Sequence, residues 1–262
     1  MSLLIESEPS QLPVLEEPEV TIRLDKVSVR YRVPHERIGT FKEYAIRTLQ
    51  RRANHDEFWA LRGVSLEVRR GEVFGIIGRN GAGKSTLLKV VSQVLRPTEG
   101  RVWLRGQVAP LLELGGGFHP ELTGRENVFL NGTLLSHSRQ EVEARFEPIV
   151  DFAELGEFID APLRTYSTGM VARLGFAVAT AWEPDILILD EVLAVGDEAF
   201  QRKCQARMRA FRDNGATVLM VSHNAATVHA MCQRALWLDH GAVRALGVAV
   251  EVVTQYQQAN AG

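Results

Sequence analysis

A single glycine-rich run limits the possible folds of this chain more than any other segment. It reads Gly78-Arg-Asn-Gly-Ala-Gly-Lys-Ser-Thr86 and matches the whole phosphate-loop pattern G-x-x-x-x-G-K-[ST]. The apolar residues 72–77 lead into it as a predicted strand, and residues 87–95 follow as a predicted helix. Backbone N–H groups at such a turn converge on phosphate oxygens, and the helix dipole adds positive potential. The run therefore predicts an α/β fold that binds a nucleoside triphosphate.

The chemistry of the loop assigns roles within it. Lys84 is expected to reach the β- and γ-phosphates, and Ser85 to ligate Mg²⁺. Gly81 and Gly83 are required because a Cβ would block the close approach or the φ values of the turn. A glycine turn without a ligand is the alternative, and the flanking strand and helix argue against it. The expected nucleotide-binding residues are Gly78, Arg79, Asn80, Gly81, Ala82, Gly83, Lys84, Ser85 and Thr86.

A second apolar run, residues 185–189, ends in the adjacent carboxylates Asp190 and Glu191. Such a continuous run is typical of a buried parallel strand. Asp190 can take the Mg²⁺ side of the site, and Glu191 can orient or deprotonate the attacking water. Two acids after a strand can also merely cap a helix. Beside a phosphate loop, they favour hydrolysis over binding alone.

A third apolar run, residues 216–222, delivers His223 at its end. This histidine is expected to hydrogen-bond the γ-phosphate, because its strand follows the one that carries the two carboxylates. A lone histidine at a strand end is usually structural, and the other six histidines receive only that interpretation.

The segment Ser167-Thr-Gly169 precedes residues 171–181, which have the composition of a helix. Ser167 stands where a helix N-cap is expected. A hydroxyl and a helix N-terminus can again contact phosphate. Taken alone, the segment is also an ordinary cap.

Composition narrows the class of partner. The 262 residues are 45% hydrophobic and 24% charged, and the net charge of −2 gives no reason to expect a nucleic-acid partner. Cys204 and Cys232 lack the spacing of a metal site and are expected to be ordinary thiols of a reducing compartment. The longest stretch without charged residues, around 216–233, is too polar for a membrane span.

In this order, the phosphate loop, Ser167-Thr-Gly169, Asp190-Glu191, Ala194-Val-Gly-Asp197 and Ser222-His223 resemble an ABC-type nucleotide-binding domain. The segment at 165–170 resembles the signature of that superfamily, with Tyr166 and Met170 at its altered first and last positions. A narrower resemblance is to the ATPase subunits of O-antigen and teichoic-acid polysaccharide exporters. It is carried by the segments 58–64, 111–127, 165–170 and 190–197.

The resemblance implies an ABC-type P-loop NTPase with a RecA-like core, an antiparallel β subdomain and an inserted α-helical subdomain at about 119–180. The domain is expected over residues 21–247, between a flexible N-terminal arm (1–20) and a short C-terminal helix or tail (248–262). A helical insert is expected at 34–57. Its basic residues suggest contact with lipid head groups or a lipid-linked glycan, and plain packing on its own domain is the alternative.

Further site residues follow from the resemblance alone. Ser167, Thr168 and Gly169 would contact the nucleotide of a second subunit, and Asp197 would lie in the contact loop across the dimer. Tyr31 matches the aromatic that stacks on adenine; Trp59 is a second candidate, and either residue could simply pack the sheet. Glu113 stands near the place of the usual glutamine of the coupling loop, since Gln107 lies too early.

The implied function is that of an ATP- and Mg²⁺-dependent ATPase subunit that exports lipid-linked polysaccharide as a head-to-tail homodimer. Its expected partners are a second copy, a polytopic permease and, through the permease, a polyprenyl-pyrophosphate-linked glycan. The expected location is peripheral, on the cytoplasmic face of the cytoplasmic membrane. No appended carbohydrate-binding domain is expected. Alternatives are a capsular-polysaccharide or drug exporter and a soluble, non-transport ABC ATPase.

Overall fold

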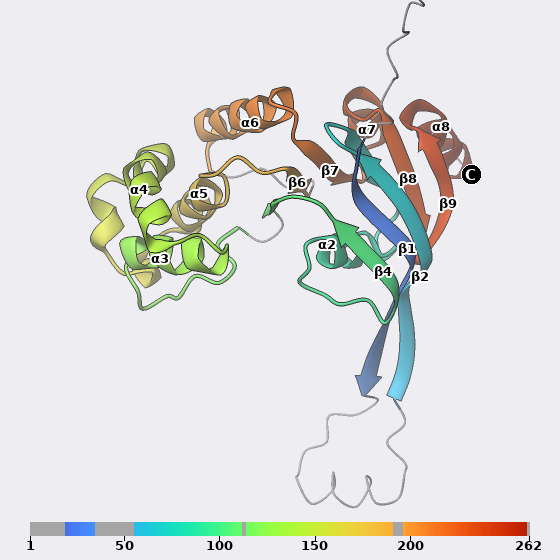
Figure 1. Ribbon diagram of the computed structural model, residues 1–262, viewed down its shortest axis with the longest axis horizontal. Coiled ribbons are helices and arrows are strands. Elements are labelled where there is room, and N and C mark those ends of the chain that lie inside the picture. The colour runs from blue at the N-terminus through green and yellow to red at the C-terminus, as the bar shows by residue number, and fades with distance from the viewer. Residues whose placement is uncertain (1–18, 35–54, 112–113, 191–195, 261–262) are drawn as a thin grey trace, which may run out of the picture.

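The computed structural model describes residues 19–34, 55–111, 114–190 and 196–260. Its smaller sheet is antiparallel, with the strand order β2-β1-β4 (Figure 1). These strands are β1 (Val20–Pro34), β2 (His55–Arg69) and β4 (Glu99–Leu104). The antiparallel β subdomain implied by the resemblance is therefore present, and β1 and β2 extend together beyond the part of β1 that pairs with β4.

The larger sheet has the order β5-β6-β7-β3-β8-β9, and only β9 runs antiparallel to its neighbour. The strands are β3 (Val73–Ile77), β5 (Val108–Leu111), β6 (Ile186–Leu189), β7 (Thr217–Ser222), β8 (Arg234–Asp239) and β9 (Ala242–Val248). The three apolar runs predicted as buried strands are β3, β6 and β7, which lie side by side. Because parallel strands end at one edge, the segments that follow these three strands meet there.

Helices cover both faces of the larger sheet. On one face, α2 (Lys84–Val91) packs between the two sheets, with a core that includes Leu87, Leu88, Phe74 and Ile76. On the other face lie α6 (Glu198–Asp213), α7 (Ala225–Met231) and α8 (Ala249–Ala259). This two-sided burial explains why the parallel strands read as unbroken apolar runs.

A helical lobe is inserted between β5 and β6, at the opposite end of the molecule from β9 (Figure 1). It contains α3 (Gly124–Leu134), α4 (Arg139–Ala153), two 3₁₀ turns (Gly156–Asp160 and Leu163–Thr165) and α5 (Thr168–Ala179). Complete capping boxes start α3, from Thr123 and Glu126, and α4, from Ser138 and Glu141. The lobe occupies the part of the chain where the helical subdomain was expected.

Two predicted boundaries need correction. Residues 34 and 55–57, expected in the helical insert, lie in strands, because the β1–β2 ladder continues to the pair Pro34–His55. The rest of the insert lies outside the described residues. Val20, expected in the N-terminal arm, begins β1, and Glu19 forms ion pairs with Arg70 and Arg105. Residues 1–18 of the arm are outside the described part of the chain.

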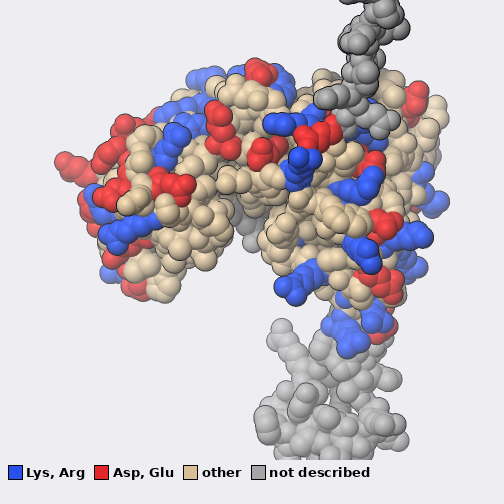
Figure 2. Space-filling model, in the orientation of Figure 1, with Lys and Arg blue, Asp and Glu red and all other residues tan. Residues whose placement is uncertain are grey.

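Within the described ranges, no helix combines the length and the apolar character that crossing a membrane requires. On the face shown in Figure 2, basic and acidic side chains occur together on the helical lobe and over the sheets. Both cysteines are free thiols, and burial raises the pKa of Cys204 to about 11 and that of Cys232 to about 12, so neither is a reactive thiolate.

Candidate nucleotide site

The phosphate loop joins a buried strand to a helix, as predicted. Every residue of β3 is buried, and α2 begins immediately after Gly83, which has φ 104°. A Cβ on Gly83 would lie 2.5 Å from the carbonyl oxygen of Ala60, and one on Gly78 would lie 2.2 Å from that of Leu238. Both positions therefore require glycine, for φ and close packing at Gly83 and for close packing alone at Gly78.

Lys84 is held within this loop. Its ammonium donates hydrogen bonds to the carbonyl oxygens of Gly78 at 2.7 Å and Arg79 at 2.9 Å. The loop is further closed by the Ala82 backbone N–H, which donates to Arg79 at 3.1 Å. The loop thus folds around its own lysine, at the first turn of α2, where backbone N–H groups and the positive end of the helix dipole favour an anion.

A cavity of about 400 Å³ opens beside the loop. It gathers residues from the ends of β3, β6 and β7 and from the β1–β2 pair, which are far apart in the sequence. Its lining residues are Tyr31, Phe58, Ala60, Asn80, Gly81, Gly83, Lys84, Ser85, Thr86, Asp190, Val221 and His223. The volume is in the range of small-molecule and cofactor sites. The donor set suits a magnesium nucleotide, because the Ser85 hydroxyl and the Asp190 carboxylate are oxygen ligands that line the same cavity as Lys84.

The predicted hydrolytic residues divide between the described and undescribed parts of the chain. Asp190 follows β6 directly and is half-buried, and His223 follows β7 and is exposed; both line the cavity. Glu191 lies outside the described residues.

The cavity has an aromatic wall that was only partly foreseen. Tyr31 and Phe58 are paired across β1 and β2, and both line the cavity. Trp59, the second candidate from the sequence, does not line it; Arg30, its partner in the ladder, lies over its ring at 5.2 Å. Successive strand residues face opposite sides, so Phe58 and Trp59 cannot share one wall. Phe58 was missed because its place opposite Tyr31 depends on the register of the β1–β2 ladder.

The signature segment begins α5, on the helical lobe. Ser167 is the N-cap, as predicted, and its hydroxyl accepts a hydrogen bond from the Met170 N–H at 3.2 Å. Ser167 and Thr168 are exposed, and Gly169 is half-buried. None of the three lines the cavity beside the phosphate loop of its own chain.

Tyr166, the altered first residue of the signature, is anchored on the lobe. Its hydroxyl donates a hydrogen bond to the carbonyl oxygen of Phe158 at 2.5 Å. Burial raises the pKa of this hydroxyl. A Cβ on Gly124 would lie 2.4 Å from the Tyr166 oxygen, so glycine at the start of α3 makes room for the tyrosine.

Asp197 is the N-cap of α6. One of its oxygens accepts from the Phe200 N–H at 2.9 Å, and the other accepts from Arg173 at 2.6 Å. The Phe200 N–H, helped by the charge of Arg173, lowers the pKa of this carboxyl.

A groove separates the helical lobe from α2. It is lined by residues of the glycine-rich segment after β5 together with side chains from both sides: Lys89, Val94, Pro110, Leu114, Gly115, Gly116, Gly117, Phe118, Asn131, Leu135, Gly175, Val178 and Ala179. Gly175 of α5 permits a tight contact here, since a Cβ would lie 2.5 Å from the Gly115 nitrogen. Glu113, the predicted coupling residue, adjoins the groove in sequence and is outside the described residues.

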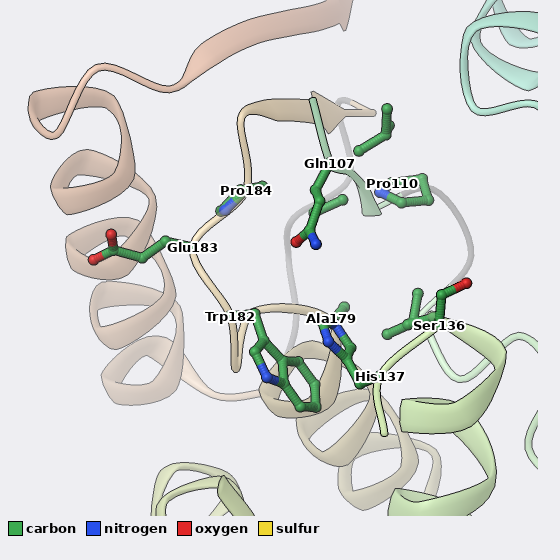
Figure 3. Close-up of a pocket in the computed structure, with 11 residues that line it drawn as sticks. Gln107, Pro110, Ser136, His137, Ala179, Trp182, Glu183 and Pro184 are labelled. Atoms are coloured by element: carbon green, nitrogen blue, oxygen red, sulfur yellow. The ribbon is translucent and has the colours of Figure 1, made fainter. Parts of the chain in front are cut away.

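A second pocket, shown in Figure 3, lies at the amino ends of β5 and β6. Its wall includes Gln107 and Pro184, and the His137 and Trp182 rings stack there at 3.8 Å. The phosphate loop and Asp190 lie at the carboxyl ends of strands of the same sheet, so this pocket lies at the opposite ends of the strands. Gln107 is accordingly absent from the lining of the cavity beside the loop.

Comparison with known proteins agrees with this arrangement. Residues 61–194 match the ABC transporter domain. An O-antigen export system ATP-binding protein of Klebsiella pneumoniae is 54% identical over 205 residues, which cover 78% of this chain and 83% of that protein. A teichoic acids export ATP-binding protein of Lactococcus lactis is 44% identical, over 78% of this chain and 44% of its own length. A dimeric ATP-binding cassette in a post-hydrolysis state, bound to ADP and Pi, has the same fold, with a TM-score of 0.65 at 24% identity over 87% of this chain and 98% of that one.

Proposed function

Since this chain belongs to the ABC transporter family, as an ATP-hydrolysing subunit related to those of O-antigen and teichoic acid exporters, we propose that it powers export of a lipid-linked polysaccharide across the cytoplasmic membrane. The observation that carries the catalytic part is the single cavity in which the phosphate loop, Asp190 and His223 meet. The similarity to the two export proteins supports the substrate class.

In the proposed site, ATP lies along the cavity with its phosphates over the loop. Lys84 and the backbone N–H groups of the loop hold the phosphates, and Ser85 and Asp190 hold Mg²⁺, which would neutralise charge that develops during phosphoryl transfer. His223 hydrogen-bonds the γ-phosphate, and Glu191 orients the attacking water. These assignments rest on the shared lining of the cavity and, for Glu191, on its place directly after Asp190.

We assign the base-binding wall to Tyr31, with Phe58 beside it. Both rings line the cavity, and an adenine that stacks on them would remove apolar ring surface of Tyr31 and Phe58 from water. Trp59 is left to pack against Arg30. Replacement of Phe58 by alanine is then expected to weaken ATP binding, whereas Trp59→Ala acts on the stability of the sheet.

The proposed catalytic unit is a head-to-tail pair of chains. Ser167, Thr168 and Gly169 sit at the N-terminus of α5, away from the cavity of their own chain, so they are available to a phosphate bound by a second copy. Each of the two ATP sites would combine one phosphate loop with the partner's signature. The dimeric state of the ADP-bound cassette of the same fold is consistent with this arrangement.

The permease is expected to engage the groove between α2 and the helical lobe. The exposed apolar side chains Val94, Leu134 and Leu135 lie on the segments that flank this groove. An apolar segment of a membrane partner would bury them, and residue 113, next to the groove-lining Leu114, would report that contact toward the Mg²⁺ site. In this arrangement the protein is peripheral, on the cytoplasmic face, and the permease selects the polyprenyl-pyrophosphate-linked glycan.

The experiment uses a tagged Glu191→Gln variant, expected to bind ATP, dimerise on it and barely turn it over. It is incubated with ATP and detergent-solubilised native membranes, and retained proteins and lipids are identified by mass spectrometry. The control carries Lys84→Gln as well, which removes the ammonium that holds the phosphates. A polytopic permease with polyprenyl-linked glycan, retained only without the second change, supports the proposal.

Other outcomes separate the alternatives. A permease without polyprenyl-linked glycan would indicate an exporter of another substrate, such as a drug, and a capsular glycan on a different lipid would indicate a capsule exporter. Retention of soluble ribosomal or repair proteins alone would overturn the transport function and leave the ATPase. Full turnover by Glu191→Gln would overturn the role of Glu191.

A further inference from the structure

Arg173, six residues after Ser167 in α5, joins three elements of the fold. Its guanidinium donates to Glu154 at 2.8 Å and to Asp197 at 2.6 Å, and it lies over the Phe200 ring at 4.8 Å from the centroid. The side chain is 19% exposed, so it is shielded more than its two acidic partners, at 51% and 62%. A planar guanidinium with forked donors is suited to two such contacts at once.

Both partners of Arg173 lie at helix ends. Glu154 ends α4 in the left-handed conformation, with φ 57°, and also accepts a hydrogen bond from Lys203 of α6 at 3.1 Å. Asp197 starts α6 and has both oxygens engaged within its own chain. The start of α6 is therefore tied to the signature helix and, through Glu154, to α4.

Gly196 gives independent support for this contact. A Cβ on this residue would lie 3.2 Å from the Arg173 Nε, and the residue has φ 68°. Because Gly196 has no side chain, the backbone at this residue can lie close to the guanidinium of Arg173. Phe200 continues the contact into the core, where its ring meets those of Phe152 and Phe176 at 5.6 and 6.3 Å.

From this geometry we infer that Arg173 is a positioning residue that makes the Ser167 end of α5 and the Asp197 start of α6 move as one unit. The inference rests on the proposed function, in which the Ser167 end meets the second copy of the chain, and on the expectation from the resemblance that Asp197 lies in the contact loop across the dimer. A shift of the signature toward the partner's nucleotide then carries the start of α6 with it.

The physical argument distinguishes this role from simple stabilisation of the fold. ATP binding by a single chain uses the cavity beside the phosphate loop, and Arg173 does not line that cavity. Pairing of two chains uses the two helix ends that Arg173 joins. Loss of the guanidinium should therefore weaken pairing and leave binding by the single chain unchanged.

The test compares Arg173→Gln and Arg173→Lys with the control Arg202→Gln. Arg202 pairs with Glu198 at 2.6 Å on the exposed side of α6 and has no contact with α5 among the interactions described for it. Two quantities are measured. The first is the Kd of a fluorescent ATP analogue at protein concentrations too low for two chains to pair. The second is the protein concentration that gives half-maximal ATP turnover. A third measurement, Tm, reports stability.

For Arg173→Gln, we expect the half-maximal concentration to rise by at least about 5-fold, the lower range of site-to-site coupling, with an unchanged Kd. Arg173→Lys should recover only part of the effect, because an ammonium lacks the fork. The control should match wild type. An unchanged half-maximal concentration, or a Kd that weakens by the same factor, would overturn the inference.

Asp197→Asn keeps the test decisive if Arg173→Gln fails to fold. Asparagine still caps α6 through its one oxygen, and the change replaces the carboxylate oxygen that accepts from Arg173 by an amide NH2 group, which cannot accept. It should raise the half-maximal concentration, and its effect should not add to that of Arg173→Lys; full additivity would contradict the inference. If turnover by the wild-type protein shows no dependence on protein concentration, the proposed pairing itself fails.

Discussion

Asn127 holds together the segment that leads from the groove into α3, and every polar atom of its side chain is engaged. The residue is fully buried. Its Oδ1 accepts from the His119 N–H at 2.7 Å. Its Nδ2 faces the carbonyl oxygens of His119, Leu122 and Thr123 at 3.1, 3.2 and 2.9 Å. The identity of the side chain is therefore fixed, since one acceptor faces a donor and the two N–H groups face acceptors.

Asn127→Ala leaves these backbone groups without their partner. An unsatisfied buried group costs about 1–3 kcal/mol, so we expect the free energy of unfolding to fall by roughly 2–4 kcal/mol. For a chain of 262 residues, an unfolding entropy of about 2.1 cal/mol/K per residue converts this loss into a decrease in Tm of about 4–7 °C.

Asn127→Asp keeps the shape and reverses one half of the hydrogen bonding. A second carboxylate oxygen would face three carbonyl oxygens, so the charged form is strongly disfavoured and the pKa of the introduced carboxyl rises. Only its protonated form can donate. The variant is thus closest to wild type below the unfolded pKa of about 3.9, and its deficit grows as the pH rises through the higher folded pKa.

The assay is thermal unfolding followed by circular dichroism between about pH 4 and pH 8, where the pH dependence reports the carboxyl. At neutral pH, Asn127→Asp should unfold at a lower temperature than Asn127→Ala. Asn214→Ala is the control: its exposed amide donates to Glu183 at 3.1 Å, and its loss should cost no more than about 0.5 kcal/mol. If Asn127→Asp matched wild type at neutral pH, the hydrogen-bond argument would be refuted.

Three shorter predictions concern packing, pH and metal. Gly175→Ala should lower Tm because a Cβ would lie 2.5 Å from the Gly115 nitrogen, and the net cost is about 1–2 kcal/mol after the gain in helix propensity. The control Gly247→Ala should leave Tm unchanged, because a Cβ there would have no atom within 4 Å. Equal Tm values for the two variants would contradict the close contact. The hydrogen bond from Lys203 lowers the pKa of Glu154, so this carboxylate stabilises the fold above its unfolded pKa and loses that effect as the pH falls through its folded pKa. Glu154→Gln should therefore lose less Tm on acidification than the wild-type protein. The same loss of Tm in both proteins would argue against the pair. Chelation of divalent cations with EDTA should abolish ATP turnover and leave the Tm of the nucleotide-free protein unchanged; activity that persists would remove Mg²⁺ from the proposed site.

The parts of the fold that could be predicted are those that one segment specifies by itself. The strands β3, β6 and β7 are continuous apolar runs, because both faces of the sheet are covered. The phosphate loop and the Ser167 cap follow from the chemistry of short segments. The side-by-side order of these strands then brings Lys84, Asp190 and His223 to one cavity without further information.

The parts that could not be predicted depend on register or on distant contacts. Phe58, not Trp59, shares the wall of Tyr31, and this depends on pairing that shifts between Val29 and Arg30, which alternation along one strand does not encode. The ladder also continues to His55, past the boundary drawn for the insert, and it is made of backbone hydrogen bonds that the side-chain pattern of one strand does not record.

The contacts of Arg173 show why such features matter for function. The helical lobe is connected to the sheets by only two chain crossings, one after β5 and one before β6. Two connections alone permit a rigid-body rotation of the lobe. Contacts between α6 and the lobe oppose that rotation: Asp197 at the start of α6 accepts a hydrogen bond from Arg173 of α5, and Lys203 of α6 donates one to Glu154 at the end of α4. A rotation that moves the signature must therefore either carry the start of α6 with it or break charge-assisted hydrogen bonds, which are stronger than bonds between neutral groups.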